Sequence, residues 1–326
     1  MAAAEKPWGV AAVTASLNAR REQKKRAPVS TLLDFEELER FENLLVFARA
    51  AVEGFFAGKH KSPWTGSSTE FADYKEYTAG DDLARLDWRV YGRTRRLFIR
   101  QYEDETDMTV YLLVDASASM RYASEKRRSK FHLAARIAAA LAYLMHKQAD
   151  KSALALFSDR VTSFLPPGGT RRHLHLLVSE LERTTPAKTT GLAAAINETI
   201  PLCKKRGRLV VISDFLDDRA ALFDALSRFL HRKFEILLLQ ILDPDELHLP
   251  GNAAARFVDS ETREAVQVDP EEIRAAYTAK MRSEIDALAR EADLRQIQHQ
   301  LVDTRSPYIH AIETYLGFRG RNQAGR

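Results

Sequence analysis

The hydrophobic positions of this chain gather, after residue 108, into short apolar runs separated by longer segments with helical spacing. Four of these runs are nearly continuous and cover residues 109–114, 153–157, 209–212 and 235–242. Between and after them, the periodicity of amphipathic helices appears at residues 130–149, 173–182, 192–205 and 220–231. Strands that are apolar on both faces lie inside a sheet covered by helices on both sides, and such sheets are mostly parallel. The pattern therefore predicts an α/β fold with a doubly wound, mostly parallel sheet.

The chain after the fourth run is predicted to extend this sheet. Strand-like runs at residues 256–258 and 265–268 predict a hairpin at an edge. Pro270 then opens a long helix that continues to about residue 292. A last strand at residues 297–302 precedes a closing helix at 307–316. The sheet is therefore expected to gain a fifth or sixth strand.

The part of the chain before residue 108 has a different texture. Apolar positions recur at helical spacing over residues 34–58, where Asp34 begins a capping-box pattern and Gly58 supplies a stop. The segment 59–105 is rich in aromatic and turn residues and carries strand-like runs at 71–77 and 97–102. We therefore expect a small β-rich module before the α/β unit.

These patterns predict three regions along the chain. They are a flexible basic tail at residues 1–30, an N-terminal helix with the β-rich module at 31–107, and the α/β domain at 108–320. The formal net charge is +4, and the tail alone accounts for it, with six Lys or Arg against two Glu. A body without net charge does not attract a polyanion. Binding of nucleic acid is therefore an unfavoured interpretation and would belong to the tail.

The single cysteine and the absence of long apolar stretches bear on the compartment. Cys203 excludes an intramolecular disulfide, which suits a reducing environment, and its position predicts a helical residue. No stretch approaches the roughly 20 apolar residues needed to cross a bilayer, and the alanine-rich start lacks a signal-peptide core. We expect a cytoplasmic protein without a membrane span.

Side chains with oxygen atoms stand where the predicted buried strands meet their loops. The candidate residues are Asp115, Ser117, Ser119, Thr190 and Asp214. Ligands of open α/β sheets bind beyond the carboxyl ends of the strands, so these oxygens are expected to converge there. A set of ligands that offers only oxygen atoms suits a hard cation, and we expect Mg²⁺ or, instead of it, Mn²⁺. A threonine hydroxyl precedes the helix that begins at Leu192, and of Thr189 and Thr190 we choose Thr190 as the candidate.

The charge of this set indicates what a cation there is for. If Asp115 is the one direct carboxylate and Asp214 acts through water, the cation keeps net positive charge. An acidic side chain of another protein then completes its coordination, which is binding and not catalysis. The plainer alternative is a polar turn that caps the next helix, and for Asp214 alone a simple N-cap is about as good an explanation.

Two sets of motifs resemble known families. The turn Asp115-Ala116-Ser117-Ala118-Ser119-Met120, with Thr190 and Ser213-Asp214, resembles the metal-ion-dependent adhesion site of von Willebrand factor A domains. Upstream, residues 74–82, 86–89 and 100–105 resemble the domain-of-unknown-function 58 family. The resemblance implies a von Willebrand factor A-like, Rossmann-like fold. It also implies a cytoplasmic adaptor or chaperone component that acts with a MoxR-type AAA+ ATPase, with the metal site receiving an acidic residue of a partner or client protein.

Two other functions compete with this non-enzymatic interpretation. A metal-dependent hydrolase or phosphatase is one, because an Asp at a strand end can be a nucleophile. The dehalogenase-type pattern would place a second Asp where Ser117 stands, and neither serine lies in a Gly-x-Ser-x-Gly elbow. A nucleic-acid-binding protein that uses the basic tail is the weaker alternative.

Overall fold

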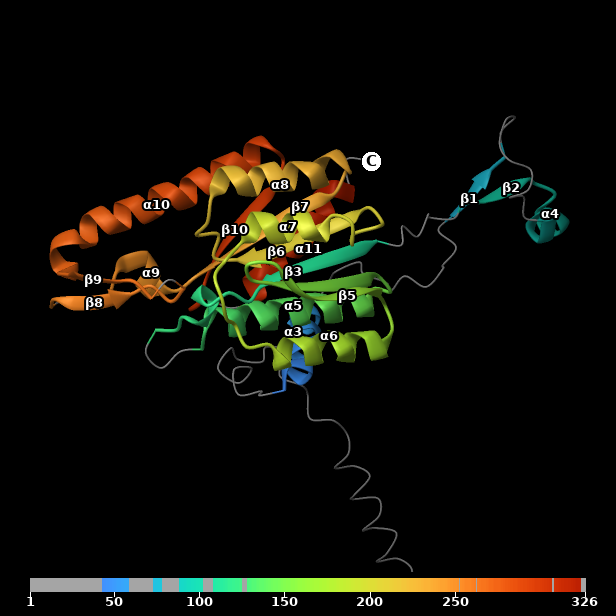
Figure 1. Cartoon of the computed structure of the whole chain (residues 1–326). Coiled ribbons are helices and arrows are strands. Elements are labelled where there is room, and N and C mark those ends of the chain that lie inside the picture. The colour runs from blue at the N-terminus through green and yellow to red at the C-terminus, as the bar shows by residue number, and fades with distance from the viewer. Residues whose placement is uncertain are drawn as a thin grey trace, which may run out of the picture.

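The computed structural model describes most of the chain from residue 43 onward (Figure 1). The described residues are 43–58, 73–77, 88–101, 108–124, 128–251, 253–261, 263–306 and 308–323. The predicted tail at residues 1–30 and the predicted helix start at Asp34 lie outside these ranges.

A six-stranded sheet forms the centre of the α/β unit (Figure 1). The strand order is β10-β7-β6-β3-β4-β5, and all neighbours are parallel except β5, which is antiparallel to β4. The strands are β3 (Thr109–Asp115), β4 (Lys151–Phe157), β5 (Val161–Gly168), β6 (Gly207–Ser213), β7 (Glu235–Leu242) and β10 (Gln298–Asp303). The predicted α/β class with a mostly parallel sheet is confirmed.

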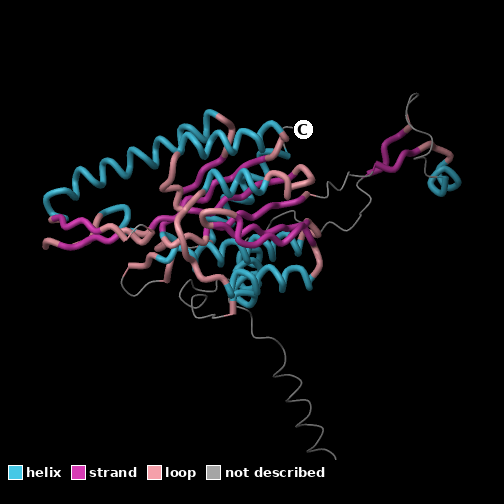
Figure 2. Tube along the Cα trace, viewed as in Figure 1, coloured by secondary structure: helices cyan, strands magenta, loops and turns pink. Residues whose placement is uncertain are grey.

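Helices cover both faces of this sheet (Figure 2). On one face, α3 (Leu44–Gly58), α5 (Lys130–Lys147), α6 (Arg171–Arg183) and α11 (Ile309–Gln323) contribute to one hydrophobic cluster. On the other, α7 (Leu192–Thr199), α8 (Arg219–His231) and α10 (Pro270–Leu294) contribute to a second. Alternate residues of β3 enter the two clusters, Leu112 the first and Leu113 the second. This alternation explains why the central strands are apolar at nearly every position.

Helix α3 packs against the α/β unit although it precedes the predicted start of that domain. The Phe47 ring meets the Tyr308 ring edge-on with centroids 4.7 Å apart, and the Arg136 guanidinium lies 4.4 Å from the Phe47 centroid. The Leu44 amide donates to Glu182 on α6 at 3.0 Å. The core thus includes a helix from before residue 108, while the predicted division of the chain into three regions stays a prediction.

The segment predicted to be β-rich contains both strands and a helix. Strands β1 (Asp73–Glu76) and β2 (Phe98–Gln101) pair antiparallel, in agreement with the predicted runs at 71–77 and 97–102. Helix α4 (Trp88–Thr94) lies between them and was not predicted. The described part of this segment is therefore a two-stranded ribbon joined to a short helix.

Edge strand β5 was not predicted from the sequence. It contains Pro166 and Pro167, and none of its side chains is fully buried. Proline lacks the amide proton that a ladder needs, so it occurs in strands mainly at sheet edges. This proline-containing edge strand lacks the continuous apolar run that identified the central strands.

The helix predicted at residues 192–205 is shorter than expected. Helix α7 ends at Thr199, two residues before Pro201, whose preceding residue is disfavoured in helical geometry. Cys203 therefore lies after the turn that follows α7 and not in a helix, and it is fully buried within the second cluster. The prediction that Cys203 is helical is wrong for this reason.

A projecting hairpin follows β7 and the short helix α9 (Pro244–His248), which was also not predicted. Strands β8 (Ala255–Val258) and β9 (Ala265–Val268) form the predicted hairpin as a separate two-stranded sheet, and not as an edge of the main one. Figure 1 shows it beside α9 and the first turns of α10. Among the described helices, none combines the length and the apolar character that crossing a bilayer requires.

Candidate functional site

The ends of β3 and β6 meet at the point where the sheet reverses its winding. From β3 the chain continues to β4 on one side and later returns to place β6 on the other side. Asp115 and Ser213 are the last residues of these two strands, and both are fully buried. The Ser213 hydroxyl donates to Asp115 Oδ2 at 2.6 Å, which joins the two strand ends. This is the usual position of a ligand site in an open α/β sheet.

The turn after β3 brings two hydroxyl groups beside Asp115. The Ser117 amide donates to Asp115 Oδ1 at 2.8 Å, so the carboxylate fixes the turn that follows it. The Ser117 and Ser119 Oγ atoms lie 3.0 Å apart, and Ser119 begins a single turn of 3-10 helix, η2 (Ser119–Arg121). Two oxygens bound at right angles to a cation about 2.1 Å away lie about 3.0 Å apart. The spacing of the two hydroxyls therefore suits neighbouring ligands of Mg²⁺.

The loop before α7 is held against this turn by two backbone hydrogen bonds. The Ala187 amide donates to the Ala116 carbonyl, and the Ala118 amide donates to the Lys188 carbonyl, both at 2.8 Å. Gly191 packs so closely that a Cβ there would lie 2.6 Å from the Asp159 carbonyl oxygen, so glycine is required at this position. Thr190 thus belongs to a segment that lies directly beside the Asp115 turn.

Asp214 follows Ser213 directly, but its carboxylate forms an ion pair with Lys130. Its Oδ2 atom accepts from Lys130 Nζ at 2.8 Å, and its Oδ1 atom accepts from the Leu216 amide at 3.3 Å. The Lys130 ammonium is fully buried and also donates to Glu246 Oε1 on α9 at 2.6 Å. Lys130 thus balances the charge of Asp214. Of the two buried aspartates at these strand ends, Asp115 is the one whose hydrogen bonds come from neutral groups, Ser117 and Ser213.

The electrostatics of Asp115 follow from this arrangement. Burial, and then the nearby Asp214 carboxylate, raise its pKa to about 7. Burial alone would lower the pKa of Lys130, but the Asp214 and Glu246 carboxylates outweigh it and the pKa is raised, so the ammonium stays charged. A bound cation at this edge would supply the positive charge that Asp115 lacks.

The five predicted ligands reach one edge of the sheet with different surroundings. Asp115, Ser117 and Ser119 are linked by short contacts, and Asp214 follows Ser213 directly. Thr190 donates its amide and its hydroxyl to Glu261 at 2.9 and 2.6 Å. The described residues contain no cluster of three His, Cys, Asp or Glu fit for a metal, so any cation here depends on hydroxyl oxygens. The donor set fits a hard cation, and the ligand assignment stays a prediction.

Three residues around the site were not predicted as part of it, and Ser213 was named in the motif but not among the candidate ligands. Ser213 had a usable signal, because it ends a buried strand immediately before Asp214. Lys130, Glu246 and Glu261 had none, since each reaches the site from a segment at least 71 residues from its partner. Local sequence shows which loops end at the sheet edge, but not which distant side chains pack onto them.

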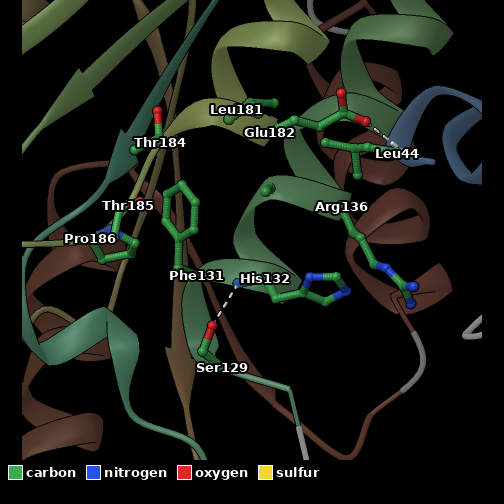
Figure 3. Close-up of a pocket in the computed structure, with 11 residues that line it drawn as sticks. Leu44, Ser129, Phe131, His132, Arg136, Leu181, Glu182, Thr184, Thr185 and Pro186 are labelled. Carbon is green, nitrogen blue, oxygen red and sulfur yellow. Dashed lines mark hydrogen bonds between the residues drawn. The ribbon is translucent and has the colours of Figure 1, made fainter. Parts of the chain in front are cut away.

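A separate pocket of about 350 Å³ opens between α5, α6 and the start of α3 (Figure 3). His132, Arg136 and Glu182 are among the residues that line it. The His132 ring contacts Arg128, with Nη1 and Nε2 3.0 Å apart. Burial, then the positive charges of Arg136 and Arg128, lower the pKa of His132 to about 4.

This shift predicts a loss of stability in acid. Histidine in the unfolded chain has a pKa of about 6.5, so it binds a proton below that pH. In the folded protein, His132 binds this proton only when the pH approaches about 4. Stability is therefore lost as the pH falls through this window. Between pH ~7.5 and pH ~5, the Tm of His132→Gln will fall less than that of the wild type. The exposed His175→Gln variant is the control, and an equal loss of Tm in both variants would contradict the assignment.

The family model described as "Protein of unknown function DUF58" matches residues 73–287. Proteins of Mycobacterium bovis (Uncharacterized protein Mb1516) and Mycobacterium tuberculosis (Uncharacterized protein Rv1480) are each 28% identical over 227 residues, 67% of this chain and 70% of theirs. The solved structure of conserved hypothetical protein BatB from Bacteroides thetaiotaomicron is 16% identical, with a TM-score of 0.43, over 65% of this chain and 99% of that one.

Proposed function

Because the chain belongs to the DUF58 family, whose description leaves its activity open, we propose a function from the site itself. The protein is a non-catalytic, divalent-cation-dependent protein-binding module. Asp115, Ser117, Ser119 and Thr190 would hold Mg²⁺ or Mn²⁺, with Asp214 acting through water. When bound, the cation supplies positive charge that attracts an acidic side chain of a partner protein.

The observation that carries this proposal is the state of Asp115. Its carboxylate is fully buried at the end of β3, and the hydrogen bonds that it accepts come from neutral groups, Ser117 and Ser213. A buried charge without a counter-charge is costly, so such a position is favoured where a cation or a proton completes it. The two serine hydroxyls 3.0 Å apart beside it favour a hard cation.

The surroundings of the serines support binding over catalysis. Among the described residues, the hydrogen bonds around the Ser117 and Ser119 hydroxyls involve each other and Asp115, with no histidine positioned to remove a proton. A nucleophilic serine needs such a base within hydrogen-bond reach. We therefore propose that the hydroxyls act as ligands and not as nucleophiles.

The proposed partner is a MoxR-type AAA+ ATPase, with the chain as an adaptor or chaperone component beside it. This proposal is supported by family membership and by the resemblance of residues 74–82 and 100–105 to proteins that accompany such ATPases. An acidic residue of the ATPase or of a client protein would bind at the cation.

The test is Mn²⁺ binding measured by calorimetry and electron paramagnetic resonance. The wild-type chain will bind one Mn²⁺, and Asp115→Ala will abolish binding, because the buried carboxylate at the end of β3 is lost. Asp224→Ala, which removes an exposed carboxylate on α8, is the matched control and will bind normally.

Capture of a MoxR-type ATPase should be lost with chelator and with Asp115→Ala. Unchanged Mn²⁺ binding by Asp115→Ala would refute the site, and phosphatase turnover that Asp115→Asn abolishes would refute the non-catalytic function.

A further inference from the structure

A glutamate of this chain already lies on one of the predicted cation ligands. Glu261 stands in the turn between β8 and β9, and its two carboxylate oxygens accept from the amide and the hydroxyl of Thr190 at 2.9 and 2.6 Å. The hydroxyl bond is short and the amide bond has the ordinary length, and together they orient the carboxylate against the loop that precedes α7. The acid comes from the projecting hairpin, 71 residues away in sequence.

The turn is built to present this carboxylate. The Glu261 amide donates to Asp259 Oδ1 at 2.7 Å, and the Asp259 amide donates to the Glu264 carbonyl at 2.8 Å. These contacts close the turn behind Glu261, so its side chain points away from the hairpin toward Thr190. The conformation of the turn therefore favours the contact of Glu261 with Thr190.

The hairpin itself buries little apolar surface. Val258 and Val266 are 51% and 61% exposed, and no residue of either strand is fully buried. Burial of apolar area is the main force that holds surface elements in place. The two hydrogen bonds between Glu261 and Thr190 consequently help to hold the hairpin tip against the loop before α7, and their loss would loosen it.

We propose that Glu261 is an internal acidic ligand of the cation site, occupying the place where the carboxylate of a partner binds. This inference rests on the proposed function, because it needs a cation held near Thr190. With the cation bound, the Glu261 carboxylate contributes its negative charge to the site. A partner's acidic side chain then has to displace Glu261, and displacement releases the β8–β9 hairpin. Partner binding and movement of the hairpin are thereby coupled.

The experiment uses Mn²⁺ and acetate as probes on the full chain. Glu261→Gln removes the charge at the contact, and Glu264→Gln removes the same charge from an exposed position in the same hairpin. Water-proton relaxivity counts the waters bound to Mn²⁺, and calorimetry gives its Kd. We expect Glu261→Gln to add one bound water and to weaken Mn²⁺ binding roughly tenfold, the equivalent of one lost charge-assisted contact. Acetate will displace a water at lower concentration in this variant than in wild type.

Hydrogen exchange gives a readout that does not depend on the metal count. Acetate added to the Mn²⁺-loaded wild type will speed exchange of the amides of Thr190 and of the hairpin turn, whereas in Glu261→Gln these amides will exchange fast from the start. Glu261→Ala, which cannot accept a hydrogen bond, will exchange at least as fast as Glu261→Gln, and Glu264→Gln will match wild type. If wild type binds Mn²⁺ but Glu261→Gln leaves bound waters, Kd and exchange unchanged, this inference alone is overturned. If wild type binds no Mn²⁺, the proposed function and this inference both fail.

Discussion

Replacing Lys130 with methionine will destabilise the protein by about 3–5 kcal/mol, the range observed when one partner of a buried ion pair is removed. The Lys130 ammonium is fully buried and donates to Asp214 and Glu246 at 2.8 and 2.6 Å. Methionine keeps the length of the side chain but leaves two carboxylates without their counter-charge. Urea denaturation at neutral pH measures the free energy of unfolding.

Two comparisons separate this electrostatic cause from a packing defect. Adding Asp214→Asn and Glu246→Gln to Lys130→Met removes the orphaned charges and will recover a large part of the loss. Lys147→Met is the matched control, because Lys147 is 53% exposed and its 3.5 Å contact with Glu53 is a surface ion pair. Such pairs contribute about 0–1 kcal/mol. Equal losses for Lys130→Met and Lys147→Met would contradict the assignment of Lys130 as the charge that holds α5, β6 and α9 together.

Gly207→Ala will destabilise the protein by about 3 kcal/mol or more, because overpacking against backbone cannot be relieved by rotating a side chain. Gly207 begins β6 and pairs with Thr109 of β3. A Cβ atom there would lie 2.0 Å from the Thr109 carbonyl oxygen, so one of the two central strands must move.

The control for this substitution is Gly317→Ala on α11. A Cβ at Gly317 would have no heavy atom within 4 Å outside its own helix, and alanine is favoured over glycine inside a helix by about 0.5–1 kcal/mol. We therefore expect Gly317→Ala to raise the Tm and Gly207→Ala to lower it. A Gly207→Ala protein with the stability of wild type would show that β3 and β6 do not approach as closely as described. The same sample will show whether the Asp115 edge tolerates a shift of β6, through its Mn²⁺ affinity.

The central sheet could be predicted because its strands are buried on both faces. Such strands must be apolar throughout, so the runs at 109–114 and 235–242 match β3 and β7 closely. Strand β5 and helix α4 could not be found in the same way. Each is polar or partly exposed, and the structure that they adopt depends on a neighbour such as β4 and not on their own pattern.

The positions of Asp115 and Asp214 at the sheet edge could be predicted, because each follows a buried run and the carboxyl ends of parallel strands lie at the same edge of the sheet. The contacts that set the charge around these two residues could not be predicted. From the local sequence, Lys130 is an ordinary first residue of an amphipathic helix, and Glu261 is an ordinary turn residue. Only the fold brings them beside Asp214 and Thr190, so the balance of charge at this edge is a tertiary property.

The hydrogen bond between Ser213 and Asp115 spans 98 residues of sequence. On the ribosome, β3, β4 and β5 emerge long before β6, so Asp115 stays without its neighbour through much of synthesis. Contacts so distant in sequence also form slowly, because the intervening chain must first be ordered. A nascent chain, or one truncated before β6, consequently lacks the Ser213–Asp115 hydrogen bond, and the proposed cation site is incomplete until β6 has been made.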